Sequence, residues 1–394
     1  MQDDSGMIDE QAVANDSAAG QTPQPPAEEM TPDQLAEAKR YGQQKLAVSL
    51  VEKATDLAAV TVFALLLARP LDAWLSEWLP CATLRLLAFF GIMTLAMALC
   101  SWPLEFYSGF VLEHRFGLSR QTLLRWLARE AKEAVLGLLL GAVVVVGLFW
   151  LIWSTGSAWW IVSALAFFVV SVVLGQLAPV LILPIFYRVE PLQDAALDER
   201  FKRLVSGTGL SIQGIYRLVL SAETAKANAM LAGLGRTRRV LLGDTLLAHF
   251  SADEIEVVFA HEVGHHVYRH IPKLIAAGFV VSLLGFWLSD RALAAWIGSD
   301  YDPGQLPVAA LPLVMLVFGA FGLLVMPLQN ILSRHFERQC DRYALRRTQL
   351  REAYRSAFRK LARLNKDDPN PNRLATFLFR SHPPIAERLA LADE

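Results

Sequence analysis

A short motif near residue 260 contains the side chains best suited to chemistry. It reads HEVGH over residues 261–265 and follows Ser251 and Glu254, whose spacing is that of a capping box and predicts the start of a helix. Side chains four residues apart share one face of a helix, so both imidazoles can reach one metal ion. Glu262 lies beside them and can take a proton from a water that attacks a carbonyl. The motif is typical of zinc hydrolases.

A third ligand would complete such a site, and Glu337 is the best candidate. Asp341 follows one helical turn later and could accept the remaining N–H of a ligating histidine. His266 and His270 lie off the face that carries the two motif histidines. On a regular helix His335 faces away from Glu337. We expect these three other histidines to be solvated or structural.

The composition indicates a chain that is partly surrounded by lipid. Of its 394 residues 54% are hydrophobic and 19% are charged, and the mean hydropathy is +0.35. A soluble protein of this size has about a quarter of its residues charged. The net charge of −1 gives no indication of nucleic acid binding. Three scattered cysteines exclude a disulfide framework and a cysteine-based zinc knuckle.

Six long apolar stretches predict membrane-spanning helices. They cover residues 54–75, 86–110, 134–153, 159–187, 274–288 and 306–328. The loop after the second stretch and the segment after the sixth are rich in arginine, whereas the loop at 154–158 has no charge. Positively charged loops stay in the cytoplasm. We therefore expect both termini and the polar regions 188–273 and 329–394 on the cytoplasmic side.

The sequence divides into three parts. Residues 1–38 contain nine acidic residues and no Lys or Arg, which predicts a disordered cytoplasmic tail rather than a signal peptide. An N-terminal membrane domain with four spans follows at 39–187, and a zinc metallopeptidase domain with two further spans occupies 188–394. The expected fold is mainly α: a polytopic membrane helix bundle with a small α+β, zincin-like unit on the cytoplasmic side. Its strands are predicted near 215–221, 227–231 and 239–242.

Several motifs together resemble the integral-membrane zinc metalloproteases typified by the type I CAAX prenyl protease, the a-factor-converting enzyme. The resemblance covers about residues 35–391. Besides the metal motif, the matching blocks are Arg40-Tyr41 with Lys45, Glu113–Thr122, Leu183–Phe186 with Pro191-Leu192, Asn228–Gly233 with Arg239–Leu246, and Ser381–Pro384 with Arg388. The acidic tail stands in the place of the family's first helix, which leaves open whether the family's membrane chamber is closed here.

The resemblance implies a role for each residue of the metal motif. His261, His265 and Glu337 would bind one Zn²⁺. Glu262 would be the general base and would later pass its proton to the leaving amine. Asp341 would orient His261.

The resemblance also implies contacts with the substrate. Asn228 and Ala229 would lie on an exposed strand edge and pair with an extended peptide. His382 would stabilise the oxyanion of the tetrahedral intermediate. Met230 replaces the aromatic residue that is usual in the family. Cys340 replaces a common alanine, and we expect it to pack in the core with its side chain away from the metal.

The predicted function is that of a membrane-embedded zinc metalloendopeptidase, CAAX-protease-like, which hydrolyses peptide bonds in peptide or protein substrates with or without a prenyl group. One alternative is a membrane-protein quality-control metalloprotease with no prenyl requirement, although the four spans ahead of the motif favour the CAAX type. Another is a non-catalytic zinc-binding membrane protein, but three ligands beside a glutamate favour an open, catalytic site. No organelle signal is visible, so we expect a bacterial inner membrane.

Overall fold

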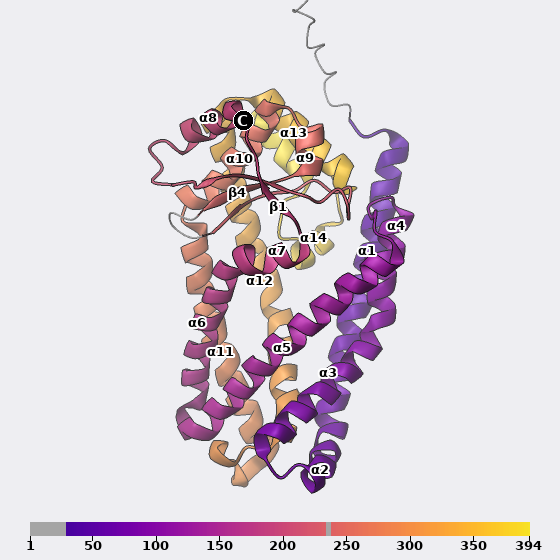
Figure 1. The fold of residues 1–394 in the computed structure, drawn as a ribbon, viewed down its shortest axis with the longest axis vertical. Coiled ribbons are helices and arrows are strands. Elements are labelled where there is room, and N and C mark those ends of the chain that lie inside the picture. Colours follow the sequence, from indigo (N-terminus) through magenta and orange to yellow (C-terminus); the bar gives the residue numbers. More distant parts are fainter. Residues whose placement is uncertain (1–28, 234–237) are drawn as a thin grey trace, which may run out of the picture.

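Helices dominate the computed structural model, which describes residues 29–233 and 238–394. A four-stranded sheet lies at one end of the long axis, and long helices run away from it (Figure 1). The start of α1 (Pro32–Val62) and the C-terminus both lie at the end that carries the sheet. The expected mainly helical bundle with a small mixed unit is confirmed.

Four helical stretches within the described residues are long and apolar enough to cross a membrane. They are Ala82–Arg115, Leu123–Phe186, His270–Asp300 and Val308–Thr348. The second stretch contains two long helices, α5 (Leu123–Thr155) and α6 (Trp159–Leu177), and the chain turns back between them where Gly156 has a φ of 55° (Figure 1). Five of the six predicted spans lie inside these stretches, with at most two residues outside. The remaining one, 54–75, falls in the run of helix that ends with α2 (Ala68–Trp78) and is not among the four.

Large apolar side chains remain exposed along these helices. Val143 of α5 is 71% exposed and Leu324 of α12 (Leu311–Thr348) is 77% exposed. Exposing such side chains to water costs free energy, whereas contact with lipid tails does not. The helices therefore have the surface of a membrane bundle.

The predicted disordered tail over residues 1–38 is wrong for its last residues, because α1 begins at Pro32. Thr31 caps this helix in a capping box with Gln34, and proline suits the first helical position because it has no N–H to satisfy. The acidic composition concealed these local signals. Residues 1–28 of the predicted tail lie outside the described residues.

The sheet has the strand order β1-β2-β4-β3, with β2 and β4 parallel and the other pairs antiparallel. Three of its strands lie close to those predicted, whereas β1 was not predicted. The strands are β1 (Val189–Pro191), β2 (Gly214–Leu218), β3 (Ala229–Ala232) and β4 (Arg239–Gly243). Because β3 is an edge strand, one side of its backbone is left open.

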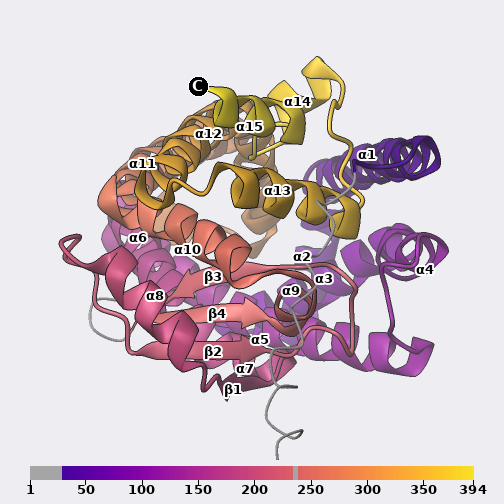
Figure 2. The ribbon, with the colours of Figure 1, turned by 90° about the horizontal axis from the view of Figure 1, so that it is seen from above.

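Several short helices surround the sheet, and α10 lies next to its β3 edge (Figure 2). One core joins them, in which Phe201 of α8 stacks on Phe259 of α10 with 4.0 Å between ring centres. The remaining helices are α3 (Ala82–Phe106), α4 (Leu112–Arg115), α7 (Leu183–Phe186), α8 (Ala195–Val205), α9 (Asp244–His249), α10 (Ala252–Val267), α11 (His270–Ile297), α13 (Arg351–Asn365), α14 (Arg373–Phe379) and α15 (Ile385–Ala390).

The motif helix α10 packs closely on α12 at a glycine. A Cβ added to Gly264 would lie 3.0 Å from the Cα of Cys340 and 3.2 Å from its Sγ. A backbone atom cannot move aside as a flexible side chain can, so the two helices would have to separate. Gly264 thus fixes how near the motif lies to α12.

Replacing Gly264 with alanine should destabilise the protein by about 1–3 kcal/mol, because the added methyl group overpacks the α10–α12 contact. Thermal unfolding in detergent measures this. Gly278→Ala is the matched control, since nothing lies within 4 Å of a Cβ at that position of α11 and alanine favours a helix. A loss of stability that is equal in the two variants would contradict the role of the close contact.

Candidate metal centre

The first turn of α10 is fixed in place by a capping box, as the sequence predicts. Ser251 Oγ accepts the N–H of Glu254 at 3.3 Å, and Glu254 Oε2 accepts the N–H of Ser251 at 2.7 Å. The buried Glu254 carboxylate is also 2.8 Å from the Lys360 ammonium of α13. These contacts set the rotation of α10 and turn its second half toward α12.

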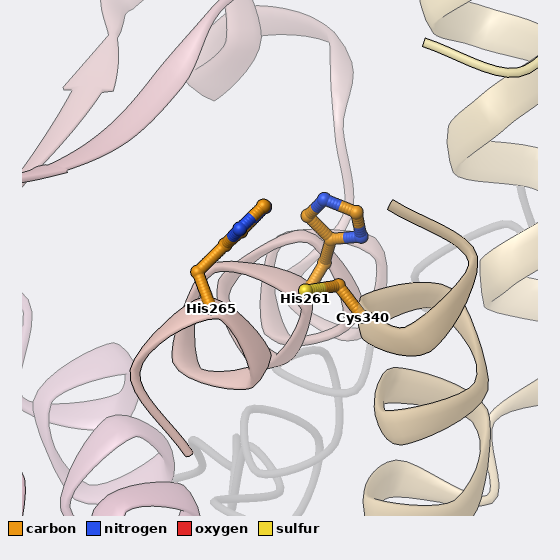
Figure 3. A group of neighbouring side chains, drawn as sticks. All are labelled: His261, His265 and Cys340. Atoms are coloured by element: carbon orange, nitrogen blue, oxygen red, sulfur yellow. The ribbon is translucent and has the colours of Figure 1, made fainter. Parts of the chain in front are cut away.

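Side chains from α10 and α12 converge at the motif. His261 Nε2 lies 3.2 Å from Glu337 Oε2, and His265 Nε2 lies 3.3 Å from Glu337 Oε1. The two imidazoles rise from the same face of α10 (Figure 3). Ligands about 2.0–2.1 Å from a tetrahedral zinc ion are about 3.3 Å from one another. The three side chains therefore have the spacing of zinc ligands.

One carboxylate oxygen of Glu337 is buried without a hydrogen-bond donor among the described residues. Its side chain is 6% exposed, and Oε2 makes no hydrogen bond within the described residues despite its closeness to His261. An unsatisfied buried carboxylate oxygen is costly in a folded protein. A metal ion between the imidazoles and this oxygen would remove that cost.

Cys340 is a second candidate for the third ligand. A nitrogen of each motif histidine lies within 4.8 Å of its sulfur. The sulfur is buried against Gly264 and lies 3.6 Å from His270 Nδ1, while both imidazoles extend away from it (Figure 3). These contacts are those of a packed core thiol, and the shorter nitrogen–oxygen distances favour Glu337.

Each motif histidine has its second nitrogen occupied. Asp341 Oδ1 lies 2.9 Å from His261 Nδ1 and accepts its N–H. His265 Nδ1 lies 3.1 Å from His270 Nδ1, and His270 Nε2 donates to Gln339 Oε1 at 2.9 Å. His270 Nδ1 must then be the acceptor for His265. In both motif histidines Nε2 is consequently the nitrogen that faces Glu337 and would ligate a metal.

The buried charges around His261 are unequal. Arg388 Nε and Nη2 donate to the two oxygens of Asp341 at 2.9 and 2.6 Å, and Arg388 Nη2 is 3.8 Å from Glu337 Oε2. One guanidinium thus faces two carboxylates. Burial acts to lower the pKa of Arg388, but the attraction of Asp341 outweighs it and the pKa is raised. The remaining negative charge suits a metal cation.

The same excess of negative charge raises the pKa of His261. Burial acts to lower its pKa, but the hydrogen bond to Asp341 and the nearby Glu337 carboxylate outweigh burial and raise the pKa of His261 to about 9. In the metal-free protein a proton therefore neutralises part of the surplus. A bound metal would take its place, since metal ligands must give up their protons.

A pocket of about 530 Å³ opens in front of the ligands and collects the other predicted site residues. Glu262, Asn228, Ala229 and His382 all line it. Asn228 directly precedes β3, and its carbonyl accepts the N–H of Gly243 at 2.9 Å. Ala229 pairs with β4 on one side only, so the β3 edge is open for an extended chain.

His382 lies in the loop between α14 and α15. Its Nε2 is 3.7 Å from Glu337 Oε1, its Nδ1 is 3.0 Å from Ser381 Oγ, and its side chain is 63% exposed. The imidazole can therefore contact a group bound in the pocket without a movement of the loop backbone.

Two of the three histidines set aside as ligands lie away from the ligand atoms. His266 contacts Arg238 at 2.9 Å and His335 contacts Gln339 at 3.2 Å. His270 is fully buried and supports His265, a contact that the sequence analysis missed. Only the packing of α11 against α12 brings it there, so the residue spacing on α10 gave no signal.

Sequence reasoning also missed a polar cluster that joins the membrane helices to the pocket. The buried carboxylate of Glu113, in α4, accepts the hydroxyl of Tyr41 at 2.7 Å and lies 2.9 Å from Lys226 Nζ. Lys226 directly precedes the pocket residue Ala227. Tyr41 and Glu113 belong to blocks noted in the sequence, but their contact with Lys226 depends on the fold.

Two protein families match the chain, one after the other. Residues 14–188 match the CAAX prenyl protease N-terminal family, described as five membrane helices. Residues 191–394 match peptidase family M48. The two matches together extend over the membrane helices and the metal centre.

Individual proteins are similar over most of the chain. An uncharacterized metalloprotease of Bacillus subtilis is 27% identical over 94% of this chain and 88% of its own. CAAX prenyl protease 1 of Saccharomyces cerevisiae is 30% identical over 78% of this chain and 72% of its own. The crystal structure of S. mikatae Ste24p, at 25% identity, superposes with a TM-score of 0.77 and covers 92% of this chain and 89% of its own.

Asp341→Asn should weaken metal binding about 10- to 100-fold, because the variant loses the carboxylate that holds His261 and balances Arg388. Competition with a chromophoric chelator measures the affinity. Asp368→Asn is the control, since Asp368 caps the neighbouring turn by accepting the N–H of Asn370 and does not line the pocket. Unchanged affinity in Asp341→Asn would show that this contact does not support the metal.

Proposed function

This chain belongs to peptidase family M48 and is an integral-membrane metalloprotease, and we propose that it hydrolyses peptide bonds with one zinc ion held by His261, His265 and Glu337. The observation that carries this proposal is the pair of nitrogen–oxygen distances, 3.2 and 3.3 Å, between the imidazoles and Glu337. Three ligands leave one tetrahedral position open, which is the arrangement of catalytic rather than structural zinc.

The residues around the open position have separate tasks. When bound, zinc would polarise the scissile carbonyl and make water a better nucleophile near neutral pH. Glu262 takes the proton of the attacking water and later gives it to the leaving amine. His382 donates a hydrogen bond to the oxyanion as charge develops. No side chain forms a covalent bond with the substrate.

The open β3 edge supports a mode of substrate binding. An extended peptide adds to the sheet beside Asn228 and Ala229, with main-chain hydrogen bonds that suit many side chains. This edge lies on the same pocket as Glu262. A scissile bond held by the edge would therefore meet the general base.

The proposed organisation follows the division of the chain that the sequence analysis predicts. Residues 39–187 form the membrane domain and 188–394 the metallopeptidase domain, both in a bacterial inner membrane with the termini in the cytoplasm. The arginine-rich segments flanking the spans support this orientation. The start of α1 and the C-terminus lie at the same end of the molecule, as the orientation requires.

CAAX-type peptides are the proposed substrates, because several relatives bear the name CAAX prenyl protease 1. Membrane proteins cleaved without any prenyl group, as in quality control, are the second candidate. The Bacillus relative, which carries no substrate in its name, resembles this chain over a greater length. A comparison of matched peptides separates the two.

Glu262→Gln should lower the turnover number about 10²- to 10⁴-fold with zinc still bound, because the amide cannot take a proton from water. A chelator should abolish activity of the wild-type protein, and added zinc should restore it. Peptide cleavage and metal content are measured on the same samples. Glu199→Gln, on the exposed face of α8, controls for loss of a carboxylate. Full activity of Glu262→Gln would exclude it as the general base.

Prenylated and unprenylated versions of one CAAX-type peptide should be cleaved at different rates, with the prenylated one preferred. The reason is that a lipid chain adds apolar contact with a membrane-embedded enzyme. The measurement is kcat/KM for each peptide in detergent, with Glu262→Gln as the inactive control. Equal constants would retain the protease and favour quality control as its task.

A further inference from the structure

A second cavity lies on the far side of His265 from the substrate pocket, where α10 turns into α11. It encloses about 950 Å³. The loop after α8 forms one wall, and the ends of α10 and α11 form another. The lining residues are Ser206, Gly207, Thr208, Gly209, Arg238, His265, His266, Val267, Arg269, Ile271, Pro272, Tyr343 and Arg347. Apart from the proposed zinc ligand His265, no residue with a role in the proposed reaction lines this cavity.

The described lining of the cavity is positively charged. Arg238, Arg269 and Arg347 belong to it, and none of its described residues is Asp or Glu. Arg347 donates to the carbonyls that end α8, including that of Ser206 at 3.1 Å, and the Arg238 guanidinium contacts His266 and forms no ion pair within the described residues. Burial lowers the pKa of Arg238, with no carboxylate to oppose it. A half-buried guanidinium without a counter-charge is costly, and a bound anion would remove that cost.

The start of α11 adds to the positive charge. Arg269 caps this 28-residue helix in a left-handed conformation, with φ 54° and ψ 43°, and its side chain makes no capping hydrogen bond. Ile271 and Pro272, in the first turn, line the cavity. The N-terminus of a helix carries about half a positive charge and free N–H groups, which favour phosphate.

The position along α11 indicates which anion would be available. Ile271 and Leu274 are each 47% exposed, so the apolar surface of this helix begins at the cavity itself. The helix is long and apolar enough to span a membrane. The cavity therefore opens at the level of the lipid headgroups, where phosphate groups are concentrated. The positive-inside rule accounts for exposed arginines such as Arg269 and Arg347, but not for the half-buried Arg238 that shares a concave site with them.

We propose that this cavity binds the phosphate of an anionic phospholipid headgroup. The phosphate lies between Arg238 and Arg269 at the start of α11, and the acyl chains follow the apolar surface below Ile271. Binding holds the α10–α11 corner at the membrane surface. Because His265 shares the cavity wall, the lipid also steadies the helix end that carries a proposed zinc ligand.

The test is lipid binding by the full-length zinc-loaded protein in detergent, followed by native mass spectrometry and thermal unfolding. The probes are short-chain phosphatidylglycerol, short-chain phosphatidylcholine and inorganic phosphate. We expect phosphatidylglycerol to bind most tightly and to raise the unfolding temperature. Arg238→Gln and Arg269→Asn should each weaken it about fivefold. Asparagine tolerates the left-handed conformation at position 269, which keeps this variant folded.

Arg125→Gln is the matched control, since Arg125 is exposed at the start of α5 in the basic loop and is not part of the cavity. Its affinity for phosphatidylglycerol should remain within about twofold of wild type. An equal loss in Arg125→Gln would overturn the proposal, because general surface attraction would then explain binding. Equal affinity for the two lipids would also overturn it.

Two further outcomes would also contradict the proposal. If inorganic phosphate binds as tightly as phosphatidylglycerol and displaces it, the site takes free phosphate and the lipid is excluded. If none of the three probes binds, the cavity is not a phosphate site and the proposal is wrong. Since phosphate can also ligate zinc, binding is repeated after chelation. Loss of lipid binding on chelation would place the phosphate on the metal and overturn the proposal.

Discussion

The approach of α10 to α12 at Gly264 is the contact on which the metal centre depends. The two histidines come from one helix and Glu337 from the other, so the distance between helix axes sets the distances between ligand atoms. A side chain at position 264 would meet the backbone of Cys340. The missing side chain thus allows the 3.2 and 3.3 Å separations that fit a tetrahedral ion.

Charge balance adds a second requirement to this steric one. Two buried carboxylates, Glu337 and Asp341, face a single buried guanidinium, that of Arg388. A protein interior does not tolerate an unbalanced charge at low cost. The α10–α12 interface is therefore built for a cation, and Asp341 and His270 decide which nitrogen of each histidine faces it. Helix packing sets the spacing of the ligand atoms, and the excess of buried negative charge favours a bound cation.

The sequence was sufficient where a local pattern carries the physics. The capping box at Ser251 located the start of α10, and apolar length located five of the spans. The sequence was not sufficient where two residues far apart in the chain make contact. No pattern relates Lys226 to Glu113, because their side chains meet only after the sheet docks on the membrane helices. Composition also misled at residues 32–38, where a capped helix overrode the acidic character of the segment.

The Glu113 cluster connects the membrane helices to the segment that leads into β3. Glu113 holds Tyr41 of α1 and Lys226, and the backbone of Ala225 donates to Leu118 O at 3.0 Å in the loop after α4. The segment that leads into β3 is therefore tied to α1 and α4 rather than to the sheet alone. If a peptide adds to β3 as proposed, the membrane helices would help to set its register. Membrane and protease parts thus form one working unit, since tilting α1 or α4 would shift the edge relative to Glu262.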